Sequence, residues 1–351
     1  HTRYLMVTGV QTCALPTLAS ISVAHSAVPA GGMAAWKFIS LAICMMVGTA
    51  SLPHILMRYF TTPSVKSARK SVAWSLFFIF LLYSSAPMLA TLSKLQLMDP
   101  TLATGIIGKS IADVQALEWV QNWSAAKQVF IADFNGDGIL QLNEWFMRGD
   151  VVVLATPEVA GLPYVISGLV AAGGMAAAMS TADGLVLAIA NALSHDLYFK
   201  IIDPKADVAK RLIVARVLLV IIGAAGAYIA SMRITSILGA VAWAFDFAMS
   251  GLFFPLVLGV WWKRANRAGA IAGMVLGLGA GTAYLIYVGP NFMAQTPWLG
   301  IDNLRFGIIG APVSLIAMVV VSLMTDAPDK ATQAMVDEVR IPSGKTILSG
   351  K

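Results

Sequence analysis

Two hydroxyls and a carboxylate stand in the middle of an apolar stretch, residues 161–198, that is long enough to cross a bilayer. Ser180 and Thr181 could each give an oxygen to a cation, and the carbonyl of Ala177 lies one helical turn before them. A sodium ion takes more oxygens than these three, so a second helix would have to complete the site. The alternative is that both hydroxyls bond to carbonyls of their own helix. Asp183 favours function, because a carboxylate at mid-depth is hard to explain by packing.

Residues 133–144 have the pattern of a calcium-binding loop. Gly138 permits the sharp turn that such a loop needs. We expect helices over 113–132 and 142–153 to flank it, and we interpret it as a structural clip that binds calcium weakly. The alternative is a turn that holds no ion. The predicted ligands are the side chains of Asp133, Asn135 and Asp137, the carbonyl of Ile139, Gln141 directly or through water, and both oxygens of Glu144.

A proline interrupts the first long apolar segment, residues 33–59. Gly48, Thr49 and Ser51 precede Pro53 within six residues. Proline removes a backbone donor and clashes with the preceding turn, so we expect a discontinuous helix. Freed backbone groups at that depth must line protein or a water-filled cavity. An anionic group would favour the positive end of the half-helix after the break, where His54 lies. The alternative is a simple kink with a packed histidine.

Asp246 is a second carboxylate inside an apolar segment, residues 234–262. A buried carboxyl group without a partner is expected to hold a proton. Three roles are open at this stage: a proton-coupling site, a cation ligand, or a neutral acid that makes hydrogen bonds. His195 and Asp196, at the end of the stretch that carries Ser180, are assigned to capping or gating.

The composition identifies the elements that position these residues as membrane-spanning helices. Of the 351 residues, 58% are hydrophobic and 12% are charged, whereas soluble domains average about 25% charged residues. The net charge of +6 is spread over short loops, and no basic-aromatic motif for nucleic acid is visible. The sequence predicts an all-α polytopic membrane protein with seven spans, at 33–59, 72–92, 161–193, 212–230, 234–262, 268–288 and 306–324.

Basic residues gather in every second connection and in the tail, which sets the orientation. Lys and Arg are enriched on the cytoplasmic side of membrane proteins. We therefore expect residues 58–70 and the C-terminus in the cytoplasm of a bacterial cell, with the loop 93–160 outside its inner (plasma) membrane. Residues 17–325 form the membrane domain and 326–351 a polar tail. Residues 1–16 fit poorly with the apolar spans of the membrane domain and are interpreted as a non-native or mis-joined end.

Three segments resemble the sodium/solute symporter family. They are GTASLPHILMRYFTTPSVKSARKSV, AAAMSTADGLVLAIANALSHDLY and FFPLVLGVWWKRANRAGAIAGMVLG, and the resemblance extends over residues 33–325. Within that family the chain is most similar to the cation/acetate symporter branch, and to a subgroup with a calcium-loop insertion like residues 133–144.

The resemblance implies a leucine-transporter fold, in which two five-helix repeats have inverted topology. The seven spans would be the second repeat and two accessory helices, so the chain would be a C-terminal fragment whose partners include the missing N-terminal helices. It implies sodium as the coupling ion and a small monocarboxylate such as acetate as the substrate. The implied sites are sodium at Ala177, Ser180 and Thr181, substrate at Gly48, Thr49, Ser51 and His54, and coupling carboxylates at Asp183 and Asp246.

Secondary transport, coupled to sodium or to protons, is therefore the predicted function. The alternative is a symporter-like membrane domain of a signalling protein that acts as a sensor. An enzyme is not expected, because the chain has four histidines and shows no nucleophile–base pair, His/Cys metal cluster or nucleotide loop. The two cysteines, Cys13 and Cys44, make no disulfide framework.

Overall fold

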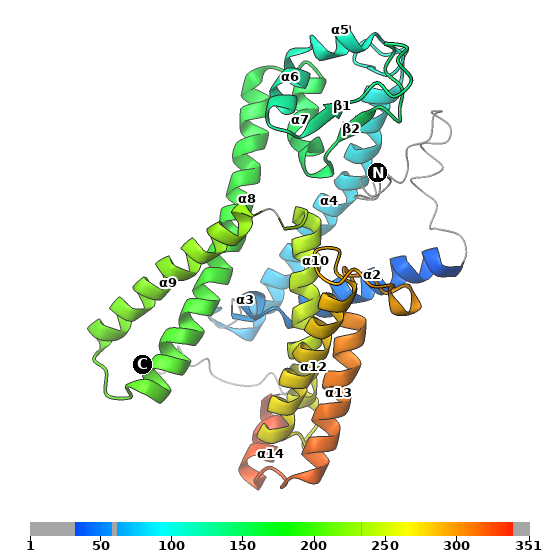
Figure 1. Cartoon of the computed structure of the whole chain (residues 1–351). Helices are drawn as coiled ribbons and strands as arrows, with labels where there is room; N and C mark the ends of the chain where they lie inside the picture. Colours follow the sequence, from blue (N-terminus) through cyan, green and yellow to red (C-terminus); the bar gives the residue numbers. More distant parts are fainter. Residues whose placement is uncertain (1–31, 58–61, 233, 340–351) are drawn as a thin grey trace. The chain divides into compact units, whose positions relative to one another are not determined.

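A computed structural model describes residues 32–57, 62–232 and 234–339 (Figure 1). The segment 1–16, interpreted above as a non-native end, lies outside these residues. The elements are α2 Gly32–Ser51, α3 Pro53–Leu56, α4 Val65–Met98, α5 Ile111–Gln115, α6 Glu118–Ala125, β1 Val129–Ile131, β2 Trp145–Met147, η3 Gly149–Val151, α7 Val152–Val159, α8 Tyr164–Asn191, η4 Ala192–Ile202, α9 Val208–Ser231, α10 Ile237–Ala248, η5 Met249–Phe253, α11 Phe254–Trp261, α12 Arg267–Val288, η6 Trp298–Gly300, α13 Gly307–Met324 and α14 Lys330–Val339.

The helices confirm the prediction of an all-α polytopic membrane protein. Within the described part of the chain, six helical segments are long and apolar enough to cross a bilayer, and a shorter apolar helix covers Trp36–Ser51. The seven predicted spans therefore all fall on apolar helices, although the first is shorter than expected. The six long segments are Val65–Met98, Tyr164–Ile202, Val208–Ser231, Ile237–Trp261, Arg267–Val288 and Gly307–Met324.

The first predicted span is discontinuous, as the sequence predicted. Helix α2 ends at Ser51, and Leu52 adopts an extended conformation with φ −70° and ψ 119°. Pro53 then opens the short helix α3. Proline is tolerated at the first position of a helix because its missing N–H would be unpaired there in any case. The break thus lies where proline would otherwise have removed a hydrogen bond from the helix interior.

The fifth predicted span is continuous but changes its winding. Between α10 and α11 the π-helical turn η5 covers Met249–Phe253. Pro255 is the second residue of α11 and has no N–H to give to the carbonyl of Gly251. A π-turn relieves that clash, and such turns are frequent at functional sites.

The described residues fall into two compact units, which we describe separately. The first is Ser71–Ser180 and contains a small globular part between α4 and α8. There β1 and β2 pair antiparallel, with Val129 opposite Met147 (Figure 1). Apolar side chains from the end of α4, from α5 to α7 and from both strands form one buried core: Leu97, Ile106, Val114, Val120, Val129, Leu140, Met147, Val151, Ala155 and Val159.

The second unit contains the described residues 32–57, 62–70, 181–232 and 234–339. Its densest packing joins α12 and α13, which run side by side (Figure 1). Gly269, Gly273, Gly277 and Gly281 follow one another at every fourth residue of α12. Small residues at this spacing let two helices approach closely. Helices α2, α10 and the η5 turn pack against this pair. The tail, predicted only as polar, contains the helix α14.

Candidate functional site

The hydroxyls next to the helix break bond to their own helix. Thr49 Oγ1 donates to the carbonyl of Met45 at 2.6 Å, and Ser51 Oγ lies 3.0 Å from the carbonyl of Gly48. The Gly48 carbonyl is among the last four of α2, which have no N–H partner within the helix, whereas the Met45 carbonyl lies inside it. His54 is half-buried in α3. The substrate assignment of these residues remains a prediction.

Gly48 has a packing role in the structure. A Cβ at this position would lie 2.5 Å from the carbonyl oxygen of Phe245 on α10, so only glycine permits the contact. The sequence did not reveal this role, because the neighbouring helix was not known. The contact brings the part of α2 just before the break against the helix that carries Asp246.

Ala177, Ser180 and Thr181 all lie in α8, as expected. Residues three and four apart on a helix share a face, so the Ala177 carbonyl and the two hydroxyls are within one turn. Asp183 lies further along the same helix, and all four residues are exposed. That these three oxygens form half of a sodium site remains a prediction.

The acidic residues of the calcium-like loop converge. Carboxylate oxygens of Asp133, Asp137 and Glu144 all lie within 4.8 Å of one another. Glu144 is fully buried, and its two oxygens accept the N–H groups of Phe134 and Gln141 at 3.0 Å each. A carboxylate oxygen can accept more than one contact, so both keep capacity for a cation. The donor set suits a hard cation such as calcium.

Backbone donors already hold the loop in a turn of the calcium-loop type. Asp133 accepts the N–H of Gly136 at 2.7 Å, and Gly136 and Gly138 both have φ near +70°. The N–H of Ile139 holds the pKa of Asp137 below its usual range, and the side-chain amides of Asn135 and Gln141 act in the same direction. These contacts therefore favour the charged form of Asp137, which is the form that binds a cation.

The elements that flank the loop differ from the prediction. The prediction of two continuous helices over 113–132 and 142–153 was wrong. Strands β1 and β2 directly flank the loop, and only short helices lie beyond them. The loop also pairs with an earlier segment of the chain. Leu140 is fully buried and exchanges backbone hydrogen bonds of 2.8 Å with residues 108 and 109. A segment earlier in the same chain thus pairs with the loop at Leu140, and an isolated bridge joins Ser110 to Ile139.

Asp246 is the most completely buried acidic group in the membrane helices. Its side chain is 0% exposed, and neither oxygen has a hydrogen-bond partner among the described residues. It lies in α10 beside Cys44 of α2 and the first residues of α13. The sequence identified Asp246 but gave no sign of Cys44, whose buried thiol looked like one more apolar position in a span.

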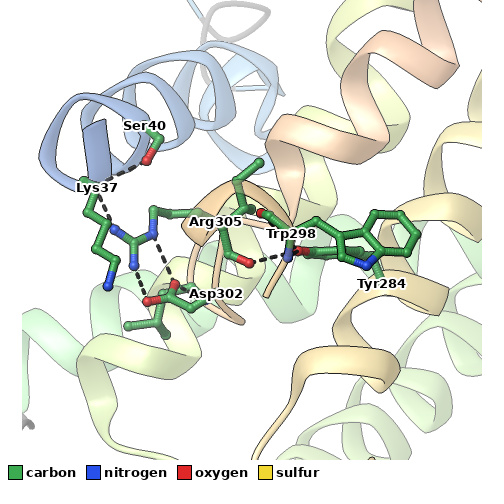
Figure 2. Close-up of polar contacts among 8 residues, drawn as sticks. Lys37, Ser40, Tyr284, Trp298, Asp302 and Arg305 are labelled. Atoms are coloured by element: carbon green, nitrogen blue, oxygen red, sulfur yellow. Dashed lines mark hydrogen bonds and ion pairs between the residues drawn. The ribbon is translucent and has the colours of Figure 1, made fainter. Parts of the chain in front are cut away.

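A buried arginine ahead of α13 was not predicted as part of any site. Arg305 forms a two-pronged ion pair with Asp302, and its remaining nitrogen donates to the carbonyl of Lys37 in α2 at 2.7 Å (Figure 2). On α12, Tyr284 accepts the N–H of Trp298 and donates to the carbonyl of Ile301. In the sequence, the available signal for this ion pair was the opposite charge of Asp302 and Arg305, three residues apart and just before a span.

Comparison with known proteins connects this arrangement to transport. Residues 151–277, which include α8, α9, α10 and α11, match the family model of the sodium:solute symporter family. No solved structure matches the chain.

Two relatives extend the likeness. An uncharacterised symporter of Cupriavidus necator is 47% identical over 296 residues, which are 82% of this chain and 42% of that protein. A monocarboxylic acid transporter of Corynebacterium glutamicum is 26% identical over 289 residues, which are 80% of this chain and 45% of that protein. The chain thus spans less than half the length of either relative.

Proposed function

Residues 151–277 belong to the sodium:solute symporter family, and from that premise we propose that the chain works in a secondary active transporter. Inward movement of sodium or protons drives uptake of a small monocarboxylate such as acetate by alternating access. The single observation that carries this proposal is that the family match contains α8, with its hydroxyl pair inside an apolar span. The monocarboxylate assignment is supported by the 26% identical relative of that name.

The proposed roles rest on the family resemblance and on the helices that carry the residues. Ser180, Thr181 and the carbonyl of Ala177 would bind sodium together with oxygens from another helix. Positive N-terminal dipoles at a broken helix attract carboxylates, and we propose that the substrate binds beside the break between α2 and α3. The substrate residues would be Gly48, Thr49, Ser51 and His54, with Asp183 and Asp246 as coupling carboxylates. The fold would be the second inverted repeat of a leucine-transporter-like protein.

Labelled-acetate uptake tests the proposal. The full product of the gene that encodes this chain is reconstituted in proteoliposomes, with and without an inward sodium gradient. We expect sodium-driven uptake that Ser180→Ala/Thr181→Ala abolishes, because two of the predicted ligands are removed. Absence of uptake under sodium and pH gradients alike, in folded protein, would contradict the transport proposal for this substrate.

A matched hydroxyl pair supplies the control. Ser84 and Ser85 are also adjacent, exposed and within a span, and both bond to carbonyls of their own helix α4. Ser84→Ala/Ser85→Ala should leave uptake and its sodium dependence unchanged. Equal losses in the two double variants would show that hydroxyl removal disturbs the helices, and would remove the support for a sodium site on α8.

We also propose that the loop 133–144 binds calcium on the outer side of the membrane, with the C-terminus in the cytoplasm. Extracellular loops of this type bind calcium with dissociation constants of about 10⁻⁴–10⁻³ M. Calorimetric titration of the purified chain with calcium chloride should give a value in this range. Asp133→Asn should remove the binding heat, whereas Asp113→Asn, an exposed acidic residue outside the loop, should not. Equal heats in both variants would contradict the loop site.

A further inference from the structure

The surroundings of Asp246 are formed by three helices. Cys44 of α2 contacts its carboxyl group, and the thiol is 1% exposed. Gly307, the first residue of α13, packs on the other side: a Cβ there would lie 2.8 Å from Asp246 Oδ1 and 3.1 Å from Met249 Sδ. Ser250 does not reach the carboxyl group, because its hydroxyl donates to the backbone carbonyl of Asp246 at 2.7 Å.

The side chains at this place do not suit a metal cation. Around the carboxyl group they present the sulfurs of Cys44 and Met249 rather than oxygens. Sodium is a hard ion, and hard cations in proteins are held by several carboxylate, carbonyl or hydroxyl oxygens. The hydroxyl of Ser250 adds no oxygen beside the carboxyl group, since it bonds to the backbone carbonyl of Asp246 instead. A proton needs no shell of oxygen ligands, because it binds to one carboxyl oxygen. The surrounding packing then shields the neutral acid from water.

An ionised carboxylate would be costly in this packed arrangement. A buried charge needs partners, and neither oxygen of Asp246 has a hydrogen bond among the described residues. A neutral acid has a much smaller desolvation penalty. The N–H groups of Phe306 and Gly307 at the start of α13 are the nearest backbone donors, but they do not form hydrogen bonds of ordinary geometry. The N-terminus of α13, the positive end of its helix dipole, still favours the ionised form of the carboxyl group.

We propose that Asp246 is a proton-binding site, occupied while α2, α10 and α13 are packed together as they are here. Burial without a hydrogen-bonded partner favours the neutral acid in this packing. Any motion that separates α2 from α10 admits water and releases the proton. The use of this site in transport rests on the function proposed above, but the binding of the proton does not.

The other titratable groups around the site have partners of their own. Arg305 and Asp302, ahead of α13, form an ion pair, and Tyr284 on α12 bonds to the loop backbone. Among the described residues, Cys44 is therefore the titratable group in contact with Asp246. Its thiol is a weak donor and a weak acceptor, so it can accompany either form of the carboxyl group without a fixed charge.

Infrared spectroscopy of the purified 351-residue chain in lipid tests proton binding directly. At neutral pH we expect a carbonyl band of a protonated carboxylic acid that is absent from Asp246→Asn. Asp113→Asn, which changes an exposed carboxylate on α5, should retain the band. Absence of an acid band from the native chain, or its persistence in folded Asp246→Asn, would overturn the proposal.

A second variant covers the case in which Asp246→Asn does not fold. Cys44→Ser replaces the weakly polar thiol beside the carboxyl group by a hydroxyl of similar size that hydrogen-bonds more strongly, so the acid band should shift in frequency while the chain stays folded. An unshifted band would assign the protonated acid to another residue and overturn the proposal for Asp246.

The transport readout separates this inference from the proposed function. With no sodium gradient, a pH gradient should drive acetate uptake by the full gene product, and Asp246→Asn should remove that uptake while Ser84→Ala retains it. Uptake that Asp246→Asn leaves intact would overturn the use of this proton in transport. Failure of all uptake by the native protein would contradict the proposed function, whereas the infrared band would still decide the proton site.

Discussion

Helices α12 and α8 both carry glycines inside an apolar span, yet their surroundings differ. In α12, a Cβ at Gly269, Gly273 or Gly277 would come within about 3 Å of a side chain or carbonyl of α13 or η5. In α8, a Cβ at Gly168 or Gly173 would meet nothing within 4 Å in the unit that holds them. The same small residue is therefore a close-packing contact in one helix and an open position in the other.

The longer helices show the same contrast. In α10–α11, α12 and α13, about a third of the apolar membrane-spanning stretch is buried, at 33%, 33% and 39%. In α4, α8–η4 and α9, 0% of the corresponding stretch is buried. Apolar surfaces of that length are stable only where lipid or further protein covers them. The packed helices thus contribute stability through contacts within their own unit, and the open helices depend on what surrounds them.

The largest effect is expected from filling the α12–α13 contact. A Cβ at Gly277 would lie 2.1 Å from the carbonyl oxygen of Ser250 and 2.6 Å from Cβ of Ser314, and backbone cannot move aside easily. Gly277→Leu should lower the free energy of unfolding by about 3 kcal/mol, as overpacking of a tight interior does. Denaturant titration of the purified chain in detergent, followed by tryptophan fluorescence, measures this.

Two glycines at open positions serve as controls for Gly277→Leu. Gly279 is on the same helix with no atom within 4 Å of its Cβ position in the described structure, and Gly173 is its counterpart on α8. Leucine at either place should leave stability unchanged or slightly raised, since glycine is a poor helix former. If Gly277→Leu were as mild as these two, the packed contact between α12 and α13 would be contradicted.

The next largest effect is expected at the Arg305 ion pair. Breaking a buried pair costs about 3–5 kcal/mol, but the Asp302 side chain is 33% exposed and water partly replaces its partner. Arg305→Met should therefore lower stability by roughly 2 kcal/mol, including the lost bond to the Lys37 carbonyl. Arg216→Met on α9, where the arginine is exposed, serves as the control in the same unfolding measurement. Equal effects would mean that the ion pair contributes nothing specific.

Much of the fold was predictable because membrane helices follow from local sequence. Length and apolarity placed the six long spans and the shorter apolar helix α2, and Pro53 predicted the break in the first span, since both depend on residues close together in the chain. The calcium-like loop was found from its spacing for the same reason, and Asp133, Asp137 and Glu144 do converge. Local patterns were therefore sufficient wherever one segment determines its own shape.

The features that the sequence did not reveal depend on contacts between distant segments. The backbone groups that pair with Leu140 come from residues 108–109, and the strands beside the loop replaced the expected helices because they close a shared core. Cys44 meets Asp246, and Arg305 reaches Lys37 across 268 positions of the chain. No periodicity within a single helix encodes such pairings, so the environment of Asp246 required the structure.

A smaller effect is expected from one hydroxyl of the packed helices. Tyr284 on α12 bonds to the backbone of Trp298 and of Ile301, at 2.9 Å and 2.8 Å. Tyr284→Phe removes both bonds and leaves backbone groups unpaired, at a cost of about 1–2 kcal/mol. Tyr228→Phe on α9, where the ring is exposed, should change stability by less than about 0.5 kcal/mol. Thermal unfolding in detergent, followed by circular dichroism, distinguishes the two.

The smallest effect, and the one of opposite sign, is expected where α13 carries a hydroxyl without a partner. Ser314 is 0% exposed, and its Oγ makes no hydrogen bond among the described residues. A buried polar group without a partner costs free energy, so Ser314→Ala should raise stability by up to about 1 kcal/mol. Ser84 on α4 is exposed and bonds to the carbonyl of Phe80, so Ser84→Ala should be neutral. A loss of stability in Ser314→Ala would show that the packed helices contain a polar contact at Ser314, and would weaken the view that close apolar packing alone joins α12 to α13.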